Sequence, residues 1–303
     1  MNRQNSRWRP WTVGATTRNR TLAVHRREPV PVAGRTSVIG LIVQHTTAYE
    51  TSRLVQAIGE AAAVAEISIV VRRVHHGGPP AELHQTAEQF VQSGVAGLVL
   101  ASVGAEAGAD RIVPPHLPVV TVDGADGWRW PDVSIDQFTG GLLATRHLLG
   151  YDHRTVWHVA GPERAPATRT REAGWRAALA EAGLTPRMVR TDGTAASAYE
   201  CGLRLARVAR CTAIFAANDY VALGVMRGMR EGGRRIPEDV SLVGYDDVPE
   251  AAYLQPPLTT VGHSFAHIGT EVLRLLVDRS RGGVRCSERV SIRPTIMSRC
   301  SVA

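Results

Sequence analysis

Short continuous apolar runs alternate with helical patterns from residue 37 onward, and this alternation constrains the fold more than any other feature. The first four runs are SVIGLIV, ISIVV, GLVLA and PVVTV, at residues 37–43, 67–71, 97–101 and 118–122. Uninterrupted apolar runs of this length are typical of parallel strands that are buried on both faces. Between the first two runs, apolar residues recur at helical spacing on one face: Leu54, Val55, Ile58 and Ala62. The pattern therefore predicts a repeated βα unit.

A second series of the same kind begins at residue 155. Its strands are expected at 155–161, 212–219 and 240–247, with a weaker strand at 187–192. The first helix of this series is expected within residues 169–184 and has apolar residues along one face. Gly183 is expected to end this helix. Strand spacings of about 20–35 residues suit right-handed βαβ crossovers. The sequence therefore predicts an α/β protein with two doubly wound parallel-sheet lobes.

Polar residues follow most of the predicted strands. In doubly wound sheets, ligands bind beyond the carboxyl ends of the strands, and two lobes with facing carboxyl edges form a cleft. The polar residues at these ends are Gln44, His45, Ser102, Asp123, Asp192, Asn218 and Asp246. We interpret this set as the edge of a binding cleft between the lobes.

The positive charge of the chain is concentrated at its start. All 35 basic residues are arginines, and eight of them lie in the first 35 residues together with one acid, Glu28, so this segment carries the whole formal excess of +7. We expect residues 1–35 to form a basic, disordered tail. It is the only part of the chain with an excess of positive charge that could contact phosphate groups. From residue 36 onward, arginines and acidic residues are equal in number, so the net charge of this part does not indicate a nucleic-acid-binding surface.

Other sequence signals argue against a membrane, secretion, a metal or a cofactor. No apolar run reaches the roughly 18 residues of a membrane span, and the start lacks the apolar segment of a secretory signal, so we expect a cytoplasmic protein. His75 and His76 lack the spacing and the nearby acid of a metal site. The four cysteines show no CxxC spacing and are expected to be reduced thiols: Cys201, Cys211, Cys286 and Cys300.

Residues 213–261, which include IPEDVSLVGYDD and PPLTTV, closely resemble the effector-binding core of the LacI/GalR transcription regulators. Similar motifs stand at 34–43, 134–149, 169–184 and 293–301. The resemblance implies the periplasmic-binding-protein type I fold, whose two lobes are joined by three crossovers and enclose a small effector. It implies a first lobe of residues 37–135 plus 263–287 and a second lobe of 136–262 plus 288–303. It also implies a homodimer that binds operator DNA.

The resemblance also implies which residues contact the effector. Arg171 matches an arginine that grips the ligand, Asn218 an asparagine, and Asp246 an aspartate that accepts from hydroxyl groups. Asp123 matches an acid from the other lobe, and His45 and the aromatic Tyr49 belong to the first loop of the cleft. An arginine, an amide and two acids suit a sugar or a related polar metabolite.

The chain departs from the family pattern in two places. Gly193 stands where the family often has an aromatic ring, and either Trp128 or Trp130 could replace that ring, although both could instead pack on the edge of the lobe. Residues 1–35 also contain no two-helix pattern where the family has a helix-turn-helix. We therefore expect the DNA-reading domain to be missing or truncated, with operator binding only if such a domain is present.

Asp246 and Asp247 close a predicted strand and could be an acid/base pair, half of a metal site or the polar lip of the cleft. Neighbouring side chains of an extended segment point to opposite sides, so we expect them not to share a proton. We interpret Asp246 as a ligand acceptor and Asp247 as a structural cap for the following turn or helix. For the helix after residue 218, we expect Asp219 to be the cap and Asn218 to face the ligand.

Two other functions remain as alternatives. A solute-binding protein of a transport or sensing system would share this fold, but it would need an export signal. An enzyme could use the cleft carboxylates, but the sequence offers neither a nucleophile with its base nor a metal cluster. We therefore expect a regulator that is not an enzyme.

Overall fold

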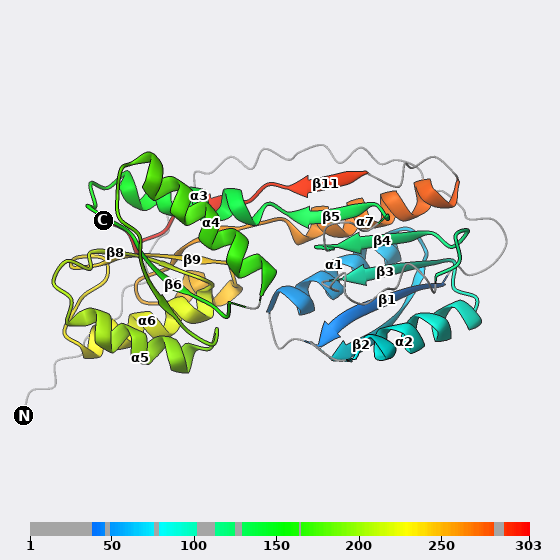
Figure 1. The fold of residues 1–303 in the computed structure, drawn as a ribbon, viewed down its shortest axis with the longest axis horizontal. Coiled ribbons are helices and arrows are strands. Elements are labelled where there is room, and N and C mark those ends of the chain that lie inside the picture. Colours follow the sequence, from blue (N-terminus) through cyan, green and yellow to red (C-terminus); the bar gives the residue numbers. More distant parts are fainter. Residues whose placement is uncertain are drawn as a thin grey trace, which may run out of the picture. The chain divides into compact units, whose positions relative to one another are not determined.

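The structure is a computed structural model that describes residues 38–45, 49–75, 79–101, 113–124, 129–163, 165–281 and 288–303. The predicted basic tail at 1–35 and the question of a DNA-reading domain lie outside the described residues. The described residues contain two six-stranded sheets, each flanked by helices (Figure 1).

The first sheet is parallel throughout, with the strand order β11-β5-β4-β3-β1-β2. Its strands are β1 (Val38–His45), β2 (Ser68–His75), β3 (Gly97–Ala101), β4 (Val119–Val122), β5 (Asp132–Ile135) and β11 (Arg289–Ile292). Leu41 and its face of the sheet pack with α1 (Tyr49–Val64) and α7 (Phe265–Ser280). Ile42 and the opposite face pack with α2 (Pro80–Gln92). Burial on both faces explains the continuous apolar runs in the sequence.

The second sheet has the strand order β12-β10-β9-β8-β6-β7 and is parallel except for β12, which is antiparallel to β10. Its strands are β6 (Trp157–Ala160), β7 (Arg187–Arg190), β8 (Ala213–Ala216), β9 (Ser241–Tyr245), β10 (Thr259–Gly262) and β12 (Thr295–Met297). One face packs with α5 (Ala195–Ala206) and α6 (Asp219–Glu231), and the other with α3 (Gln137–Leu149) and α4 (Pro166–Glu181). The predicted α/β architecture of two doubly wound lobes is confirmed.

The described elements connect the two sheets at three places. The chain passes from β5 to α3 at residue 136, from β10 to α7 at 263–264, and from β11 to β12 at 293–294. The sequence analysis assigned all of 288–303 to the second lobe, which is wrong for β11. This strand pairs in parallel with β5 in the first sheet, because Val290 and Ile292 complete the apolar core around α7.

Two glycines allow α3 and α4 to pack at very short range. A Cβ atom on Gly141 of α3 would clash with the backbone oxygen of Arg171, and one on Gly174 of α4 would clash with the backbone oxygen of Phe138. Asp136 fixes the start of α3, because its carboxylate accepts a hydrogen bond from the backbone N–H of Thr139. The close approach brings the second turn of α4 against the first turn of α3.

We expect Gly174→Ala to lower the free energy of unfolding by roughly 1–3 kcal/mol, because the added methyl group meets backbone that side-chain rotation cannot move. Gly59→Ala in α1 is the matched control, since its Cβ would lie at an ordinary 3.5 Å from Ile69 Cδ1. The control should gain about 0.5–1 kcal/mol from helix propensity. Urea melts measure both changes. Equal stabilities of the two variants would contradict the packing argument.

Candidate functional site

The site is centred on Arg171, which projects from the second turn of α4 with only 6% of its side chain exposed. Nε donates to Gln137 Oε1 at 2.6 Å, Nη1 to the backbone oxygen of Ala217 at 2.8 Å, and Nη2 to Glu50 Oε1 at 2.7 Å. The guanidinium also lies over the Tyr245 ring, 3.7 Å from its centroid. Residues from both lobes therefore hold this arginine in one orientation.

Two carboxyl groups lie beside Arg171, and their pKa values are shifted in opposite directions. Oδ1 of Asp246 lies 3.6 Å from Arg171 Nη2, close enough for charge attraction but too far for a hydrogen bond. Burial and the negative charge of Glu50 raise the pKa of Asp246 well above its ordinary range, although Arg171 opposes the shift. Burial also raises the pKa of Glu50, but Arg171 and its other partners outweigh burial, so the net pKa is below the ordinary value. Of these two carboxyl groups, Glu50 therefore favours the charged form more strongly than Asp246.

Asp246 lies beside Arg171 and Asp247 lies beside Arg299, so the two carboxyl groups are separate, as expected. The reason is not the extended backbone that the sequence suggested. Both residues have positive φ angles, 101° and 49°, so the segment is a turn and not extended backbone. Asp247 accepts a hydrogen bond from Arg299 Nη2 at 2.7 Å. The 3-10 helix η3 (Pro249–Tyr253) that follows has no side-chain cap. The predicted capping role of Asp247 is therefore wrong, because its carboxylate instead anchors the C-terminal segment.

The predicted cap of α6 is wrong, because Asn218 and not Asp219 occupies that position. Asn218 caps the helix, because its Oδ1 accepts from the backbone N–H of Val221 at 2.8 Å. Asp219 is 1% exposed and accepts from Thr260 Oγ1 at 2.6 Å and from the backbone N–H of Val248 at 2.9 Å. It therefore ties α6 to β10 and to the turn after β9. The cap uses only the oxygen of the Asn218 amide, so a ligand contact through its nitrogen stays a prediction.

Asp123 follows β4 with a φ of 47°, and its Oδ1 accepts from the backbone N–H of Ile135 at 3.0 Å. Burial raises the pKa of Asp123 to about 7, and the negative charges of Glu50 and Asp132 act in the same direction. The electrostatic influence of Glu50 and Arg171 on this carboxyl places it in the same polar neighbourhood as the arginine.

Tyr49 and His45 stand at the end of the first sheet. Tyr49 packs edge-on against Phe265, with ring centroids 6.1 Å apart, and touches the apolar cores of both lobes. The backbone of His45 pairs with His75 at the end of β1. The position of the His45 side chain lies outside the described structure, so its ligand contact stays a prediction.

Four side chains of this site were not predicted from the sequence: Glu50, Gln137, Tyr245 and His263. Within the described part of the chain, Tyr245 Oη, Asp246 Oδ1 and both ring nitrogens of His263 are buried and have no hydrogen-bond partner. Burial lowers the pKa of His263 to about 4, so its ring is neutral near pH 7. His263 directly follows β10, so the rule that identified Asp246 could have found it. Only the structure reveals the pairing of Glu50 with Arg171.

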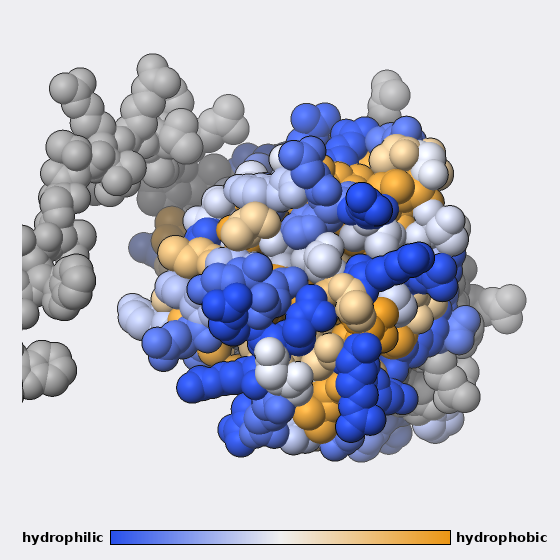
Figure 2. All heavy atoms as spheres, turned by 90° about the vertical axis from the view of Figure 1, so that its left-hand side faces the viewer, coloured by the Kyte–Doolittle hydropathy of each residue, from blue (hydrophilic) through white to orange (hydrophobic). Residues whose placement is uncertain are grey.

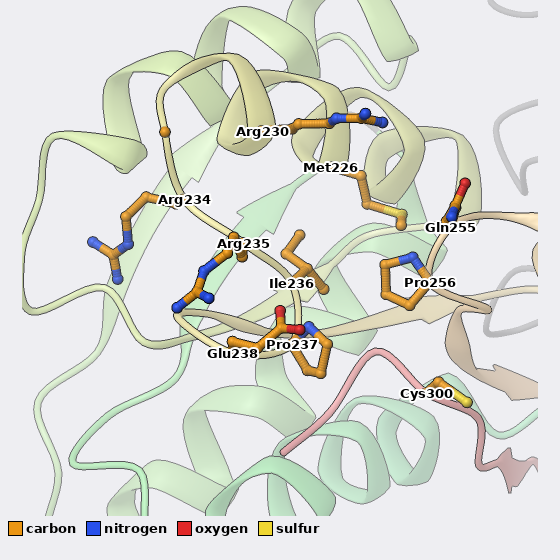
Figure 3. Close-up of a pocket in the computed structure, with 11 residues that line it drawn as sticks. Met226, Arg230, Arg234, Arg235, Ile236, Pro237, Glu238, Gln255, Pro256 and Cys300 are labelled. Carbon is orange, nitrogen blue, oxygen red and sulfur yellow. The ribbon is translucent and has the colours of Figure 1, made fainter.

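Two other features do not contribute to this site. Trp130 is 2% exposed and packs in the core beneath α2, so it provides no ring to a ligand, and Trp128 lies outside the described residues. A groove of about 670 Å³ on the second lobe is lined by Arg230, Arg234, Arg235 and apolar residues (Figure 3). Arg234 donates to two backbone oxygens and Arg235 pairs with Asp239, so both serve the local fold.

Comparison with known proteins identifies the family. The sequence profile of the periplasmic binding protein-like domain matches residues 145–302, about half of the chain. The chain belongs to this family. Its relatives place it among the effector-binding regions of LacI/GalR type.

Three described cysteines, Cys201, Cys211 and Cys300, are free, and no helix in the described ranges has the length and apolarity needed to span a bilayer.

One similar protein is the HTH-type transcriptional repressor PurR of Haemophilus influenzae, which is 34% identical over 194 residues. The match spans 61% of this chain and 57% of that relative. The lac repressor dimer bound to operator and an anti-inducer has the same fold, with a TM-score of 0.81, 24% identity and coverage of 89% of this chain and 95% of that one. The complex of the transcriptional regulator CelR with cellobiose gives a TM-score of 0.76, 29% identity and coverage of 88% and 85%.

We expect Asp123→Asn to change how stability depends on pH. The folded-state pKa near 7 lies above the ordinary 3.8, so the stabilising contribution of this carboxyl is complete below about pH 4 and is lost as the pH rises through 7. Asparagine keeps the acceptor for Ile135 and tolerates the positive φ, but it does not titrate.

Relative to wild type, the Asn variant should therefore gain on the order of 1 kcal/mol between about pH 4 and pH 8, because partial solvent exposure screens much of the shift. Asp152→Asn, an exposed aspartate that also has positive φ, is the control. Denaturant melts across this range measure the difference. Parallel pH profiles for wild type and Asp123→Asn would refute the assignment.

Proposed function

We propose that this chain is the effector-binding part of a LacI/GalR-type transcription regulator, and that its effector is a small hydroxylated molecule such as a sugar. The observation that carries the proposal is a group of buried, unpartnered polar atoms in the described structure, on Tyr245 and Asp246 beside Arg171 and on His263, which is within the electrostatic influence of Glu50 and Arg171. Buried polar atoms almost always have partners in folded proteins. Hydroxyl groups can both donate and accept, so a polyol could satisfy all of them.

The site takes residues from both sheets, which supports a regulatory role. Tyr49 and Glu50 come from the first lobe, and Arg171 and Asp246 come from the second. A ligand that contacts both lobes stabilises one of their relative arrangements over others. An attached DNA-reading segment would report that change as altered operator affinity. This role is binding and not catalysis, and its place in the cell is the cytoplasm, where operators are found.

The names of the relatives agree with this proposal. PurR is named as a transcriptional repressor, and the CelR structure contains a sugar, cellobiose. A solute-binding protein would share the fold, but PurR, CelR and the lac repressor all carry the names of regulators. We therefore assign Arg171, Asn218, Asp246, Asp123, His45 and Tyr49 to the effector site, together with Tyr245 and His263.

A thermal-shift screen against sugars and nucleosides tests this function. We expect at least one of these compounds to raise the melting temperature, and Arg171→Lys to weaken its binding at least about tenfold, or about 1.4 kcal/mol. Lysine cannot reproduce the fixed geometry that meets Gln137, Ala217 and Glu50 at once. Arg176→Lys, an exposed site on the same helix, should leave binding unchanged. Absence of any hydroxylated ligand in the screen would contradict the proposal.

We also propose that the chain forms a homodimer, as the lac repressor does in its operator complex. Apolar patches interrupt the hydrophilic surface shown in Figure 2. Large exposed apolar side chains include Tyr220 and Leu223 on one face of α6, each 41% exposed, and Tyr253 of η3, which is 87% exposed. Ala251 of η3 packs in the same apolar core as Val221 and Ala222 of α6, so η3 lies next to α6. This α6–η3 surface is our candidate contact between copies.

Leu223→Asp together with Tyr253→Asp should convert the dimer to a monomer in analytical ultracentrifugation, because burial of two carboxylates opposes association. Tyr151→Asp is the control, since Tyr151 is also exposed, at 45%, but follows α3, which covers the other face of the second sheet. A dimer that survives the double substitution would place the interface elsewhere.

A further inference from the structure

The chain itself already satisfies the charge of Arg171. Three oxygens of the chain accept from its Nε, Nη1 and Nη2 atoms, and Glu50 supplies the only anion among them at hydrogen-bond distance in the described structure. The second carboxyl, Asp246, stands at 3.6 Å. These bonds use three of the five N–H donors of the guanidinium, and an anionic ligand at the other two would lie beside the Glu50 carboxylate, whose charge opposes its binding.

Glu50 is positioned to stay in place as a charged group. It lies in the first turn of α1, where the helix N-terminus favours a negative side chain. Its side chain is 31% exposed, and the Arg171 side chain is 6% exposed. Arg171 and other partners outweigh burial and keep the pKa of Glu50 below its ordinary value. The first lobe thus provides a permanent counter-ion to an arginine of the second lobe.

Three residues of the site that have unpartnered atoms, Tyr245, Asp246 and His263, carry no positive charge. Tyr245 Oη and the two ring nitrogens of His263 are uncharged, and Asp246 has a pKa well above its ordinary range because of burial and the nearby Glu50. The unpartnered polar atoms on Tyr245, Asp246 and His263 are therefore hydroxyl, carboxyl and imidazole atoms. They can bind hydroxyl or amino groups, but they cannot neutralise a carboxylate or a phosphate.

We propose that Glu50 is a specificity-determining residue: as an internal counter-ion to Arg171, it restricts the effector to uncharged or cationic hydroxylated molecules and excludes anionic ones. This inference rests on the proposed function, because it concerns the same effector site. It gives Arg171 a different role from that of an anion receptor. The guanidinium orients its neighbours and the Tyr245 ring, while the ligand meets the uncharged groups.

Chemical rescue tests the counter-ion without any knowledge of the effector. The full chain is melted in sodium acetate and in sodium chloride at equal ionic strength, as wild type, Glu50→Ala and Glu60→Ala. Acetate should raise the melting temperature of Glu50→Ala relative to chloride, because it can replace the lost carboxylate beside Arg171. Wild type should show no such difference. Glu60→Ala, in the same helix but paired with Gln56 near the surface, should behave like wild type.

If Glu50→Ala does not fold, Glu50→Gln serves in the same comparison, because glutamine keeps the size and the acceptor oxygen but removes the charge. An equal response of wild type and the Glu50 variant to acetate overturns the counter-ion role.

Matched sugars test the selectivity. Calorimetry compares glucose, glucuronate and glucosamine, and the corresponding galactose set, on wild type, Glu50→Gln and Glu60→Gln. Wild type should prefer a neutral sugar or amino sugar to its uronate by at least tenfold, and Glu50→Gln alone should reduce that ratio at least fivefold. Equal binding of uronate and parent sugar by wild type, or an unchanged ratio in Glu50→Gln, overturns the selectivity.

The two experiments separate this inference from the proposed function. Acetate rescue without binding of any sugar contradicts the sugar effector and supports the counter-ion. Sugar binding without acetate rescue, and with equal affinity for the uronate, supports the effector site and overturns the role of Glu50.

Discussion

The ion pair between Arg171 and Glu50 is the interaction on which the site depends. It joins the second turn of α4 to the first turn of α1 at 2.7 Å, and so connects a helix of one sheet with a helix of the other. A buried arginine without an anion would be strongly unfavourable, and an ion pair with additional hydrogen bonds removes most of that cost. Gln137, Tyr245 and Asp246 lie directly against the guanidinium of this pair.

The fold supplies this arrangement through features that are remote from the ligand groups. Gly141 and Gly174 allow α3 to approach α4 until Gln137 reaches the guanidinium. Asp219 fixes the turn after β9 by accepting from Val248 and Thr260, and this turn holds Asp246 at a φ of 101°. The positive φ angles of Asp123, Asp246 and Asp247 show that the ends of the strands bend sharply where they enter the site.

Much of the architecture could be predicted from the sequence, because strands buried on both faces leave continuous apolar runs that are easy to recognise. Asp246 was found for a related reason, since it follows a strand at the carboxyl edge, whereas Arg171 was found through the resemblance to the LacI/GalR regulators. The cap of α6 was assigned to Asp219 instead of Asn218 because either side chain can cap a helix, and only the tertiary contact of Asp219 with Thr260 decides between them. Glu50 was missed because its partner is 121 residues away in the chain. The assignment of β11 failed because its pairing with β5 is equally remote.

The central claim is that an uncharged hydroxylated molecule binds beside an intact ion pair between the lobes. A crystal structure of the full chain with a sugar that raises its melting temperature tests this claim most directly. We expect ligand hydroxyl groups within hydrogen-bond distance of Tyr245 Oη, Asp246 and His263, with Glu50 still paired to Arg171. A ligand seated in the groove of Figure 3, or one whose anionic group has displaced Glu50 from Arg171, would contradict the account.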